Sequence, residues 1–515
     1  MCGIFAYLSD NQRNHKEIPL LKENGMKCQH RGPDKTNELC IHGETSFNYF
    51  LFHRLSINGL NQKSDQPMKL HGNDNHLLLC NGEIYNYKEL AKEYNIQLET
   101  DSDCEIILHL YKLSRVNEFI KKLDGVFSFL IYDKSLNQVI VGHDPFGIRP
   151  LYYSQVDKEL FFSSEMKCLS ELTTEIKFYP PGSFSFIDLK TFDMKTYSYY
   201  QIAYEQIKDT DETIIITTIQ NKLEKAVQKR LVSDRPLGCL LSGGLDSSAI
   251  TSIVCQQMGA ENVHTFAIGL EGSPDLLSAQ KVADYLGTHH TNVVVSEKDM
   301  LEAIDETIYQ IESNDTTTIR ASVPMFLLSK YIRDNTDIKV ILSGEGSDEA
   351  SGSYLYFHNA PNETLFQKEC LRLLQDVRYF DVLRGDKTTA GSGLELRVPF
   401  FDKEFMNYYM GIPPEKKMVR DGMEKYLLRK AFVNRLPEEI VWRRKDGFSD
   451  GVSSFEKPWY EIINEYTQKE HGCSEKKYYD KIFQKYFPNQ TNIIPYEWLP
   501  KWTNQKNPSG RLVSK

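Results

Sequence analysis

The sequence contains no apolar run of the ~18 residues that a membrane-spanning helix needs, so we expect no membrane segment. The apolar start of the chain lacks a basic region and runs into Ser9 and Asp10, which is not the pattern of a signal peptide. The 10 cysteines include no Cys-x-x-Cys pair, which excludes zinc-ribbon and thioredoxin-like motifs. We therefore expect a cytoplasmic protein with reduced thiols.

Positive charge is in deficit, since 61 lysines and arginines face 71 aspartates and glutamates, a formal net charge of −10. An acidic chain is a poor candidate for binding nucleic acid over its whole surface, so we expect no nucleic-acid partner, although a local basic patch remains possible. The sequence has neither an internal repeat nor a low-complexity tract. With 515 residues, of which 40% are hydrophobic, the chain has enough apolar material for two or more packed domains.

The predicted secondary-structure pattern changes near residue 210. Before this point, short β-type runs dominate, at residues 4–8, 47–55, 76–80, 126–132, 138–141 and 160–162, with helical patterns at 87–94 and 104–113. After it, strands at 236–241, 264–270 and 339–342 alternate with helices at 214–231, 247–258 and 278–286. This alternation predicts a layered α+β domain at residues 2–205 and a parallel, doubly wound α/β domain at residues 206–515.

A cysteine directly follows the initiator methionine. Cys2 is small enough for Met1 to be removed, which would give the cysteine a free α-amine with a pKa near ~8. Such an amine can take the proton of the adjacent thiol, so one residue would supply both the nucleophile and the base. Many proteins carry a cysteine at this position without any catalytic use for it, so the hypothesis depends on the motifs that follow.

Five further motifs occur along the first domain. They are His30-Arg31-Gly32-Pro33-Asp34, His53-Arg54-Leu55-Ser56-Ile57, Asn81-Gly82-Glu83, Asp103 at a predicted helix start, and Asp144-Pro145-Phe146-Gly147-Ile148-Arg149-Pro150. In this order behind Cys2, they resemble the glutamine amidotransferase domain of the N-terminal-nucleophile type over residues 2–190. The resemblance implies a four-layer α/β/β/α sandwich.

The same resemblance implies a role for each residue of this site. Cys2 would attack the glutamine side-chain amide, while the Asn81 side chain and the Gly82 backbone N–H would form the oxyanion hole. The implied glutamine-binding residues are Arg54, Asn81, Gly82, Glu83 and Asp103. Arg54 would grip the α-carboxylate, and the two acidic side chains would hold the α-ammonium. Taken singly, Arg54 could be an exposed strand arginine and Asp103 a plain helix cap.

A glycine loop joins a predicted strand to a predicted helix in the second domain. It reads Leu241-Ser242-Gly243-Gly244-Leu245-Asp246-Ser247-Ser248. The backbone N–H groups of such a loop, with the positive end of the helix dipole, can cradle an anion. The Gly-Lys-Ser/Thr ending of a Walker A loop is missing. The motif instead resembles the pyrophosphate loop of enzymes that cleave ATP between its α and β phosphates.

Two more motifs accompany this loop. Ser343-Gly344-Glu345-Gly346-Ser347-Asp348-Glu349 also follows a strand, and strand carboxyl ends gather at one crevice of an open α/β sheet, so we expect both loops to face one nucleotide. Asp246 and Asp348 carry oxygen ligands of the kind that Mg²⁺ prefers. The basic run Trp442-Arg443-Arg444-Lys445 suits a pyrophosphate clamp, although alone it would be interpreted as a solvated surface.

Together the two domains resemble the class B, glutamine-hydrolysing asparagine synthetase family over nearly the whole chain. Further matching segments are Gly272-Ser273-Pro274-Asp275-Leu276, Thr317-Thr318-Ile319-Arg320-Ala321-Ser322, Tyr354-Leu355-Tyr356-Phe357-His358, Leu394-Glu395-Leu396-Arg397-Val398-Pro399-Phe400 and Asn507-Pro508-Ser509-Gly510-Arg511. The resemblance implies synthesis of asparagine from aspartate, ATP and glutamine-derived ammonia, through β-aspartyl-AMP. It also implies an ammonia passage between the domains and a homodimer.

The resemblance assigns the residues of the synthetase site. The implied ATP-binding residues are Leu241, Ser242, Gly243, Gly244, Asp246, Ser247, Ser248, Ile268, Ser343, Gly344 and Lys445, with Asp246 and Asp348 for Mg²⁺. Glu345 would be the general base when ammonia attacks. Lys387, Glu395 and Arg397 are candidates for the aspartate pocket.

Some features depart from the family pattern. His143 stands where arginine is usual, Gly385 stands where alanine is usual, and the segment around Ser351 has small side chains. The tail after the Lys445 motif is also short. These departures concern the acceptor pocket more than the reaction class.

Three other functions remain possible from the sequence. One is an amidotransferase with another carboxylate acceptor, or a ring-closing synthetase, although ring closers do not need the Cys2 site. Another is a non-catalytic regulator, against which the presence of Cys2, Asp246, Glu345 and Asp348 argues. A third is a phosphoribosyl-pyrophosphate amidotransferase, a class that lacks the Ser-Gly-Gly-x-Asp-Ser loop.

Overall fold

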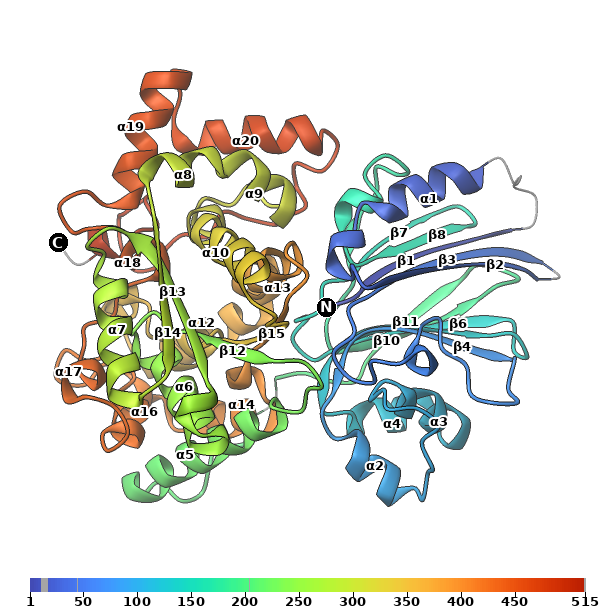
Figure 1. Ribbon diagram of the computed structural model, residues 1–515, viewed down its shortest axis with the longest axis horizontal. Coiled ribbons are helices and arrows are strands. Elements are labelled where there is room, and N and C mark those ends of the chain that lie inside the picture. The colour runs from blue at the N-terminus through green and yellow to red at the C-terminus, as the bar shows by residue number, and fades with distance from the viewer. Residues whose placement is uncertain (11–16, 44, 203, 514–515) are drawn as a thin grey trace.

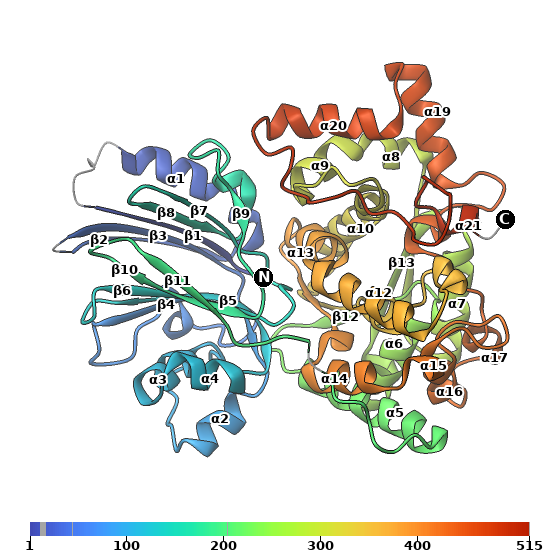
Figure 2. The same ribbon diagram turned by 180° about the vertical axis from the view of Figure 1, so that it is seen from behind.

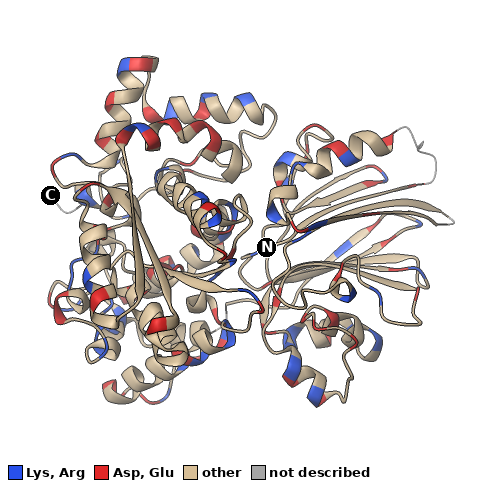
Figure 3. Ribbon diagram, in the orientation of Figure 1, with Lys and Arg blue, Asp and Glu red and all other residues tan. Residues whose placement is uncertain are grey.

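The computed structural model describes residues 1–10, 17–43, 45–202 and 204–513. The chain forms two lobes that lie side by side, a β-rich lobe from the N-terminal part and a mixed α/β lobe from the rest (Figure 1). Acidic and basic residues are interspersed along both lobes (Figure 3). Within the described ranges, no helix combines the length and the apolar character needed to cross a membrane.

Two antiparallel sheets build the N-terminal lobe. The first has the order β2 (Lys35–His42), β3 (Ser46–Arg54), β1 (Gly3–Asp10), β8 (Glu159–Ser163), β7 (Tyr152–Val156) and β9 (Lys177–Phe178). The second has the order β11 (Met194–Ser198), β10 (Ser183–Asp188), β6 (Gln138–His143), β5 (Gly125–Asp133) and β4 (His76–Ile84). The helix α1 (Ile18–Met26) covers the first sheet, and α2 (Tyr87–Glu93), α3 (Glu105–Leu113) and α4 (Val116–Lys122) cover the second (Figures 1 and 2).

Alternation along the strands explains these layers. On β1, Ile4, Ala6 and Leu8 belong to the apolar cluster between the two sheets, whereas Phe5 and Tyr7 belong to the cluster that includes Leu21 of α1. Successive side chains of a strand point to opposite faces, so a strand that is apolar at every position must be covered on both faces. The predicted α/β/β/α sandwich is confirmed, as are the helices predicted at 87–94 and 104–113, to within two residues at either end.

One parallel sheet organises the second lobe. Its order is β14 (His289–Val295), β13 (His264–Leu270), β12 (Leu237–Leu240), β15 (Val340–Leu342) and β16 (Glu395–Arg397), and every neighbouring pair is parallel. From β12 the chain adds β13 and then β14 on one side, and it then returns to add β15 and β16 on the other side. The predicted doubly wound sheet is therefore confirmed, with its topological switch point between β12 and β15.

Helices surround this sheet. They are α5 (Glu212–Lys229), α6 (Leu245–Met258), α7 (Pro274–Leu286), α8 (Glu297–Glu302), α9 (Ile304–Ile311), α10 (Thr316–Asn335), α11 (Ser347–Ser351), α12 (Glu363–Asp376), α13 (Asp381–Ala390), α14 (Lys403–Gly411), α15 (Pro414–Lys417), α16 (Tyr426–Phe432), α17 (Glu438–Val441), α18 (Phe448–Gly451), α19 (Trp459–His471), α20 (Glu475–Tyr486) and α21 (Gly510–Val513). Helix α7 begins four residues before its predicted start because Ser273 caps it and Pro274 occupies its first turn.

The two lobes share a buried boundary. An apolar cluster continues across it, from Leu55, Ile57 and Ile148 of the first lobe to Leu396 and Phe400 of the second. A cluster so extended argues for a fixed orientation, because separating the lobes would expose its apolar surface to water.

A carboxylate from the second lobe binds the first lobe at this boundary. Glu312, with a left-handed φ of 57°, ends α9 and is fully buried. Its carboxylate accepts the backbone N–H groups of Met166 (2.8 Å) and Lys167 (2.7 Å) and pairs with Lys387 on α13. One side chain therefore satisfies two buried donors and one buried cation.

We expect Glu312→Ala to lower the free energy of unfolding by about 3–5 kcal/mol, because it leaves Lys387 buried and unpaired. The thermal unfolding midpoint measures this effect. Glu306→Ala is the control, since Glu306 pairs with Lys330 at an exposed position and its loss should cost less than about 1 kcal/mol. Equal midpoints for the two variants would contradict the interpretation.

Candidate functional site

A small cavity surrounds Cys2 in the first lobe. It holds about 370 Å³ and is lined by Arg54, Gly82, Glu83 and Asp103 among others. Cys2 immediately precedes β1 in the centre of the first sheet, while Gly82 and Glu83 lie on β4 of the second. The cavity is therefore built where the two sheets of the sandwich come together.

Asn81 lies beside the nucleophile. The Cys2 backbone N donates to Asn81 Oδ1 at 2.9 Å. Asn81 Nδ2 is buried and, among the described residues, has no hydrogen-bond partner. An unpartnered buried donor is costly to keep, so its presence next to Cys2 indicates a site prepared for an acceptor atom.

The steric surroundings of Gly82 explain its lack of a side chain. A Cβ at this position would lie 2.1 Å from Val126 O and 2.5 Å from Phe127 Cα on the neighbouring strand. Any larger residue would push β4 away from β5 and displace the backbone beside Asn81. Burial raises the pKa of the Cys2 thiol to about 11, so the thiol needs a base to react near neutral pH.

Two acidic side chains face the same cavity. Burial raises the pKa of Asp103 to about 6, even though its Oδ2 accepts the Ile84 N–H at 2.6 Å. Burial also raises the pKa of Glu83, and the nearby Asp103 charge raises it further. Such a pair gains from a bound cation, because a positive charge between them relieves both desolvation and repulsion.

Arg54 lines the cavity and also holds its rim. Its guanidinium donates to Asn61 O (3.0 Å), to Asp65 Oδ1 (2.6 Å) and to Gly59 O. These bonds fix the loop of residues 59–65 against β3. The side chain is 5% exposed, so it is not the exposed strand arginine that the sequence left possible.

Glu395 reaches the small cavity from the other lobe. It lies on β16, and its Oε1 accepts from Arg397 Nε at 2.8 Å. Arg397 Nη2 also lies 3.6 Å from Glu83 Oε2. Lys387 pairs with Glu312 at the boundary between the lobes. None of these three predicted acceptor residues lines the large cavity described next; the structure places them at the boundary between the lobes.

The large cavity opens at the switch point of the parallel sheet. It encloses about 1480 Å³, its open mouth included. The predicted residues that line it are Leu241, Ser242, Gly244, Asp246, Ser247, Ile268, Ser343, Gly344, Glu345, Asp348 and Lys445. Gly243 and Ser248 are buried behind it. The two predicted loops therefore do face one space, as expected for the carboxyl ends of β12 and β15.

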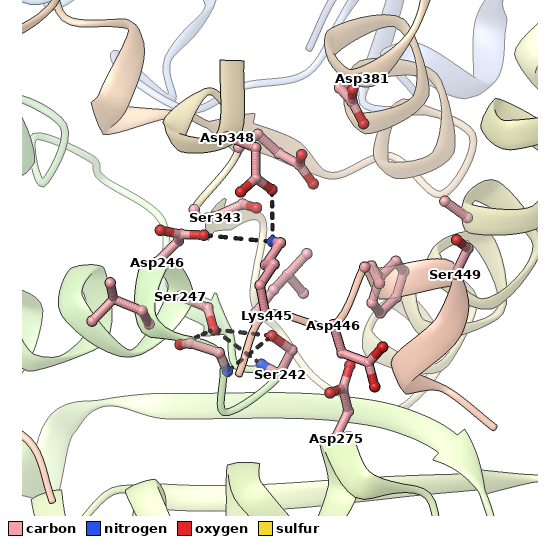
Figure 4. A pocket seen from close by; sticks show the side chains of 18 of the residues that line it. Ser242, Asp246, Ser247, Asp275, Ser343, Asp348, Asp381, Lys445, Asp446 and Ser449 are labelled. Carbon is pink, nitrogen blue, oxygen red and sulfur yellow. Dashed lines mark hydrogen bonds and ion pairs between the residues drawn. The ribbon is translucent and has the colours of Figure 1, made fainter. Parts of the chain in front are cut away.

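Two lysines lie between two aspartates in this cavity. Lys425 Nζ donates to both Asp246 and Asp348. Lys445 Nζ donates to Asp348 Oδ2 at 2.7 Å and lies 3.8 Å from Asp246 Oδ2 (Figure 4). Burial disfavours the charged form of Asp348, but the two ammonium groups together hold the pKa of this carboxyl well below its usual range. Both ammonium groups therefore lie between the two carboxylates.

A second charged group lines the opposite part of the cavity. Arg384 Nη2 donates to Glu345 Oε2 (2.8 Å) and to Asp381 Oδ1 (2.7 Å). The Tyr354 hydroxyl donates to Glu349 Oε1 (2.6 Å) and lies 3.1 Å from Asp381 Oδ2. Burial raises the pKa of Glu345, while Arg384 opposes this effect. The arrangement combines a carboxylate suited to accept a proton with a fixed guanidinium.

Sequence reasoning missed Lys425, Asp381 and Arg384. Lys425 precedes a seven-residue helix, α16, and no glycine loop or basic run marks it. Arg384 lies three residues before Lys387 on α13. Residues three apart lie near one another on one side of a helix, yet Arg384 lines the cavity whereas Lys387 pairs with Glu312 at the lobe boundary. The pairing of Arg384 with Glu345 could have been found only from the folded chain.

The departures from the family pattern are accommodated. His143 Nε2 lies 2.8 Å from Arg149 O and joins the turn that Asp144 organises. At Gly385 a Cβ would lie 2.6 Å from Leu396 Cδ2, so glycine permits α13 to pack closely on β16. Ser351 Oγ donates to Ser347 O within α11. None of these three residues lines the large cavity.

Gly344→Ala should disrupt the large cavity. Its Cβ would lie 2.8 Å from Ser247 N and 2.9 Å from the Asp246 backbone, so the two loops would have to separate. Gly244→Ala is the matched control, because there a Cβ meets only Ser242 Oγ, at 3.3 Å. We expect Gly344→Ala to lower the free energy of unfolding by about 1–3 kcal/mol, which a lower thermal midpoint would show. Gly244→Ala should change the midpoint little. A larger loss of stability in Gly244→Ala than in Gly344→Ala would contradict this packing.

Comparisons with known proteins agree with this architecture. The family model of the glutamine amidotransferase domain matches residues 1–222. The asparagine synthase model matches residues 218–367 and 359–505. Glutamine-hydrolysing asparagine synthetases from Pongo abelii and Homo sapiens are each 39% identical to the chain, over 564 and 565 residues, covering 100% of this chain and 99% of each relative.

The corresponding protein of Gallus gallus is 38% identical over 560 residues, covering 100% of this chain and 98% of the relative. The family predicted from the motifs is thus confirmed at full length. The chain belongs to the family of glutamine-hydrolysing asparagine synthetases.

Proposed function

We propose that this protein synthesises asparagine from aspartate, with ammonia released from glutamine and with ATP converted to AMP and pyrophosphate. One observation carries this proposal: a single chain of this family contains both sites. The first is Cys2 beside Asn81 Nδ2, a donor without a partner among the described residues, and the second is the large cavity at the switch point of the parallel sheet. The first half of the reaction is assigned to residues 2–205 and the second to residues 206–515. A boundary there is supported by the end of β11 at Ser198 and the start of α5 at Glu212.

The glutaminase half uses Cys2 as nucleophile. Once Met1 is removed, the α-amine takes the thiol proton and the sulfur attacks the side-chain amide carbon of glutamine. Asn81 Nδ2 and the Gly82 N–H stabilise the oxyanion. The C–N bond then breaks, ammonia leaves with the proton, and water hydrolyses the thioester to glutamate. Glutamine is oriented by Arg54 at its carboxylate and by Glu83 and Asp103 at its ammonium.

The synthetase half activates aspartate. An oxygen of its β-carboxylate attacks the α-phosphorus of ATP, and the bond to the β-phosphate breaks to release pyrophosphate. The glycine loop of residues 241–248 binds the phosphates, helped by Ile268, Ser343 and Gly344 along the nucleotide. Lys425 and Lys445 stabilise the charge that accumulates on the leaving pyrophosphate. Ammonia then attacks the activated carbonyl carbon, Glu345 takes a proton, and AMP leaves.

Aspartate is assigned to the part of the large cavity beside Glu345. Arg384 offers a guanidinium for its α-carboxylate, and Asp381 offers a carboxylate for its α-ammonium. Both side chains line the cavity, and Arg384 is only 4% exposed. Lys387, Glu395 and Arg397 are instead assigned to the boundary that ammonia crosses, where they hold the lobes in register.

We also propose Mg²⁺ for the large cavity. Asp246 and Asp348 fit this ion, because both line the large cavity and carboxylate oxygens beside bound phosphates are protein ligands that it commonly uses. Bound Mg²⁺ would neutralise phosphate charge. A cytoplasmic location is proposed because all 10 cysteines are free thiols. A homodimer is proposed from the family resemblance, and sedimentation of the purified protein would test it.

The proposed reaction is tested with Cys2→Ala. We expect this variant to lose glutamine-dependent asparagine synthesis, because it lacks the sulfur nucleophile, and to keep synthesis from ammonium salts. Wild-type protein with aspartate, MgATP and amide-¹⁵N glutamine should yield ¹⁵N-asparagine and AMP in equal amounts. Glutamate without asparagine would mean another acceptor, and the absence of both activities would mean a regulatory protein.

The pKa of Asp103 predicts how glutamine binding depends on pH. The carboxyl has a pKa of about 6, so below this value it is protonated and no longer attracts the α-ammonium. We expect the KM for glutamine to rise by about tenfold for each pH unit below the pKa and to level off above it. Steady-state glutaminase assays over this range measure the effect. Asp103→Asn should give a high KM at every pH, and a flat wild-type profile would contradict the assignment.

A further inference from the structure

The last described segment of the chain runs back to the large cavity. Residues 507–512, which we name the C-terminal strap, include the start of α21, which Figure 2 shows in the second lobe next to the C-terminal end. The strap contacts residues 446–455, a stretch that includes α18. Asp446, Gly447, Phe448 and Ser449 of this stretch line the large cavity, together with Lys445. The strap itself does not line the cavity.

The strap is anchored on a buried carboxylate. Ser509 Oγ donates to Asp450 Oδ1 at 2.7 Å, and the Gly510 N–H donates to Asp450 Oδ2 at 2.9 Å. Asp450 directly follows Ser449, the last residue of this stretch that lines the cavity, and is 4% exposed. Because a buried carboxylate needs such donors, the bonds between strap and stretch are costly to break.

Arg511 extends this attachment along the stretch. Its Nη1 donates to Ser454 O at 2.7 Å, and its Nη2 lies 3.2 Å from both Ser453 O and Asp446 Oδ2. Its guanidinium also covers the Phe455 ring at 4.4 Å from the centroid. The planar guanidinium of Arg511 thus connects the carbonyls that follow α18 with the Asp446 carboxylate that precedes it.

The opposite end of the strap is held by another wall of the cavity. Arg320 Nη1 donates to Asn507 Oδ1 at 2.8 Å. Arg320 belongs to α10, whose Thr317, Thr318 and Ala321 line the cavity. The strap therefore connects two walls, the α10 wall and the stretch that follows Lys445.

We propose that Arg511 is a positioning residue for ATP, acting through the stretch that follows Lys445. This inference rests on the proposed assignment of ATP to the large cavity. The stretch contains Gly447 and a helix of only four residues, so little within it resists disorder. A tether that orders it before ATP arrives reduces the entropy lost on binding, and Lys445 then stays near Asp348.

The test compares Arg511→Ala with Arg511→Lys in the full-length protein. We expect the Kd for ATP, measured by calorimetry without aspartate or glutamine, to rise by about tenfold in Arg511→Ala as charge-assisted bonds are lost. Arg511→Lys should recover part of the affinity, because it keeps the charge beside Asp446. The glutaminase KM should stay unchanged, since the strap lies in the other lobe. Arg333→Ala is the control, because Arg333 pairs with its own neighbour Asp334.

Each outcome decides the proposal. A weaker Kd for ATP with normal glutaminase activity supports it, whereas an unchanged Kd overturns it. A parallel loss of ATP binding and glutaminase activity would also overturn it, since that result indicates a general loss of structure. The measurement does not depend on asparagine formation, so a wild-type protein that binds ATP but makes no asparagine would refute only the proposed function.

Discussion

The buried guanidinium of Arg31 is the interaction on which the relation between the two sites depends. Its Nε donates to the Cys2 carbonyl at 2.9 Å, and its other nitrogens pair with Glu165 (3.1 Å) and with Asp386 of the second lobe (2.8 Å). Burial disfavours the cation, but the two carboxylates raise its pKa, so the charge persists without contact with water. Removing one partner from such a cluster leaves an uncompensated charge, which is far more costly than losing an exposed pair.

This cluster links helix α13 to both sites. Asp386 and Lys387 on α13 bind groups at the lobe boundary, whereas Asp381 and Arg384 on the same helix line the large cavity. A helix is a stiff rod, with a rise of about 1.5 Å per residue, so its two ends keep a fixed spacing. The distance from Cys2 to Glu345 is thus fixed by the short-range packing of one element.

The parts of the site that were predicted from sequence lie in continuous motifs. The glycine loops contain within a few residues both the turn and the polar groups, and strand ends gather by topology alone, so Asp246 and Asp348 could be paired in advance. Lys425 and Arg384 come from helices whose apolar spacing says nothing about which polar side chain faces a cavity. The short strand β16 was not predicted, because three residues carry no periodicity. Glu395 was assigned to the aspartate pocket from the family resemblance, whereas in the structure it lines the cavity around Cys2.

The strength of the apolar pattern also explains which strands were predicted. Strands buried on both faces, such as β1 and β5, have long apolar runs and were found, whereas the polar edge strand β2 was not. Edge strands are partly solvated and carry charged residues that reduce unwanted pairing, so their sequences differ little from loops.

The position of Glu395 has a consequence for how this architecture can be divided. Because the second lobe supplies Glu395 to the wall of the cavity around Cys2, an N-terminal lobe cut free at its connection would open that cavity to bulk water. Ammonia released in the opened cavity would be lost to solvent. The boundary between the lobes, more than their covalent connection, is therefore what nitrogen transfer would require, and two separate polypeptides could meet that requirement by rebuilding the same boundary.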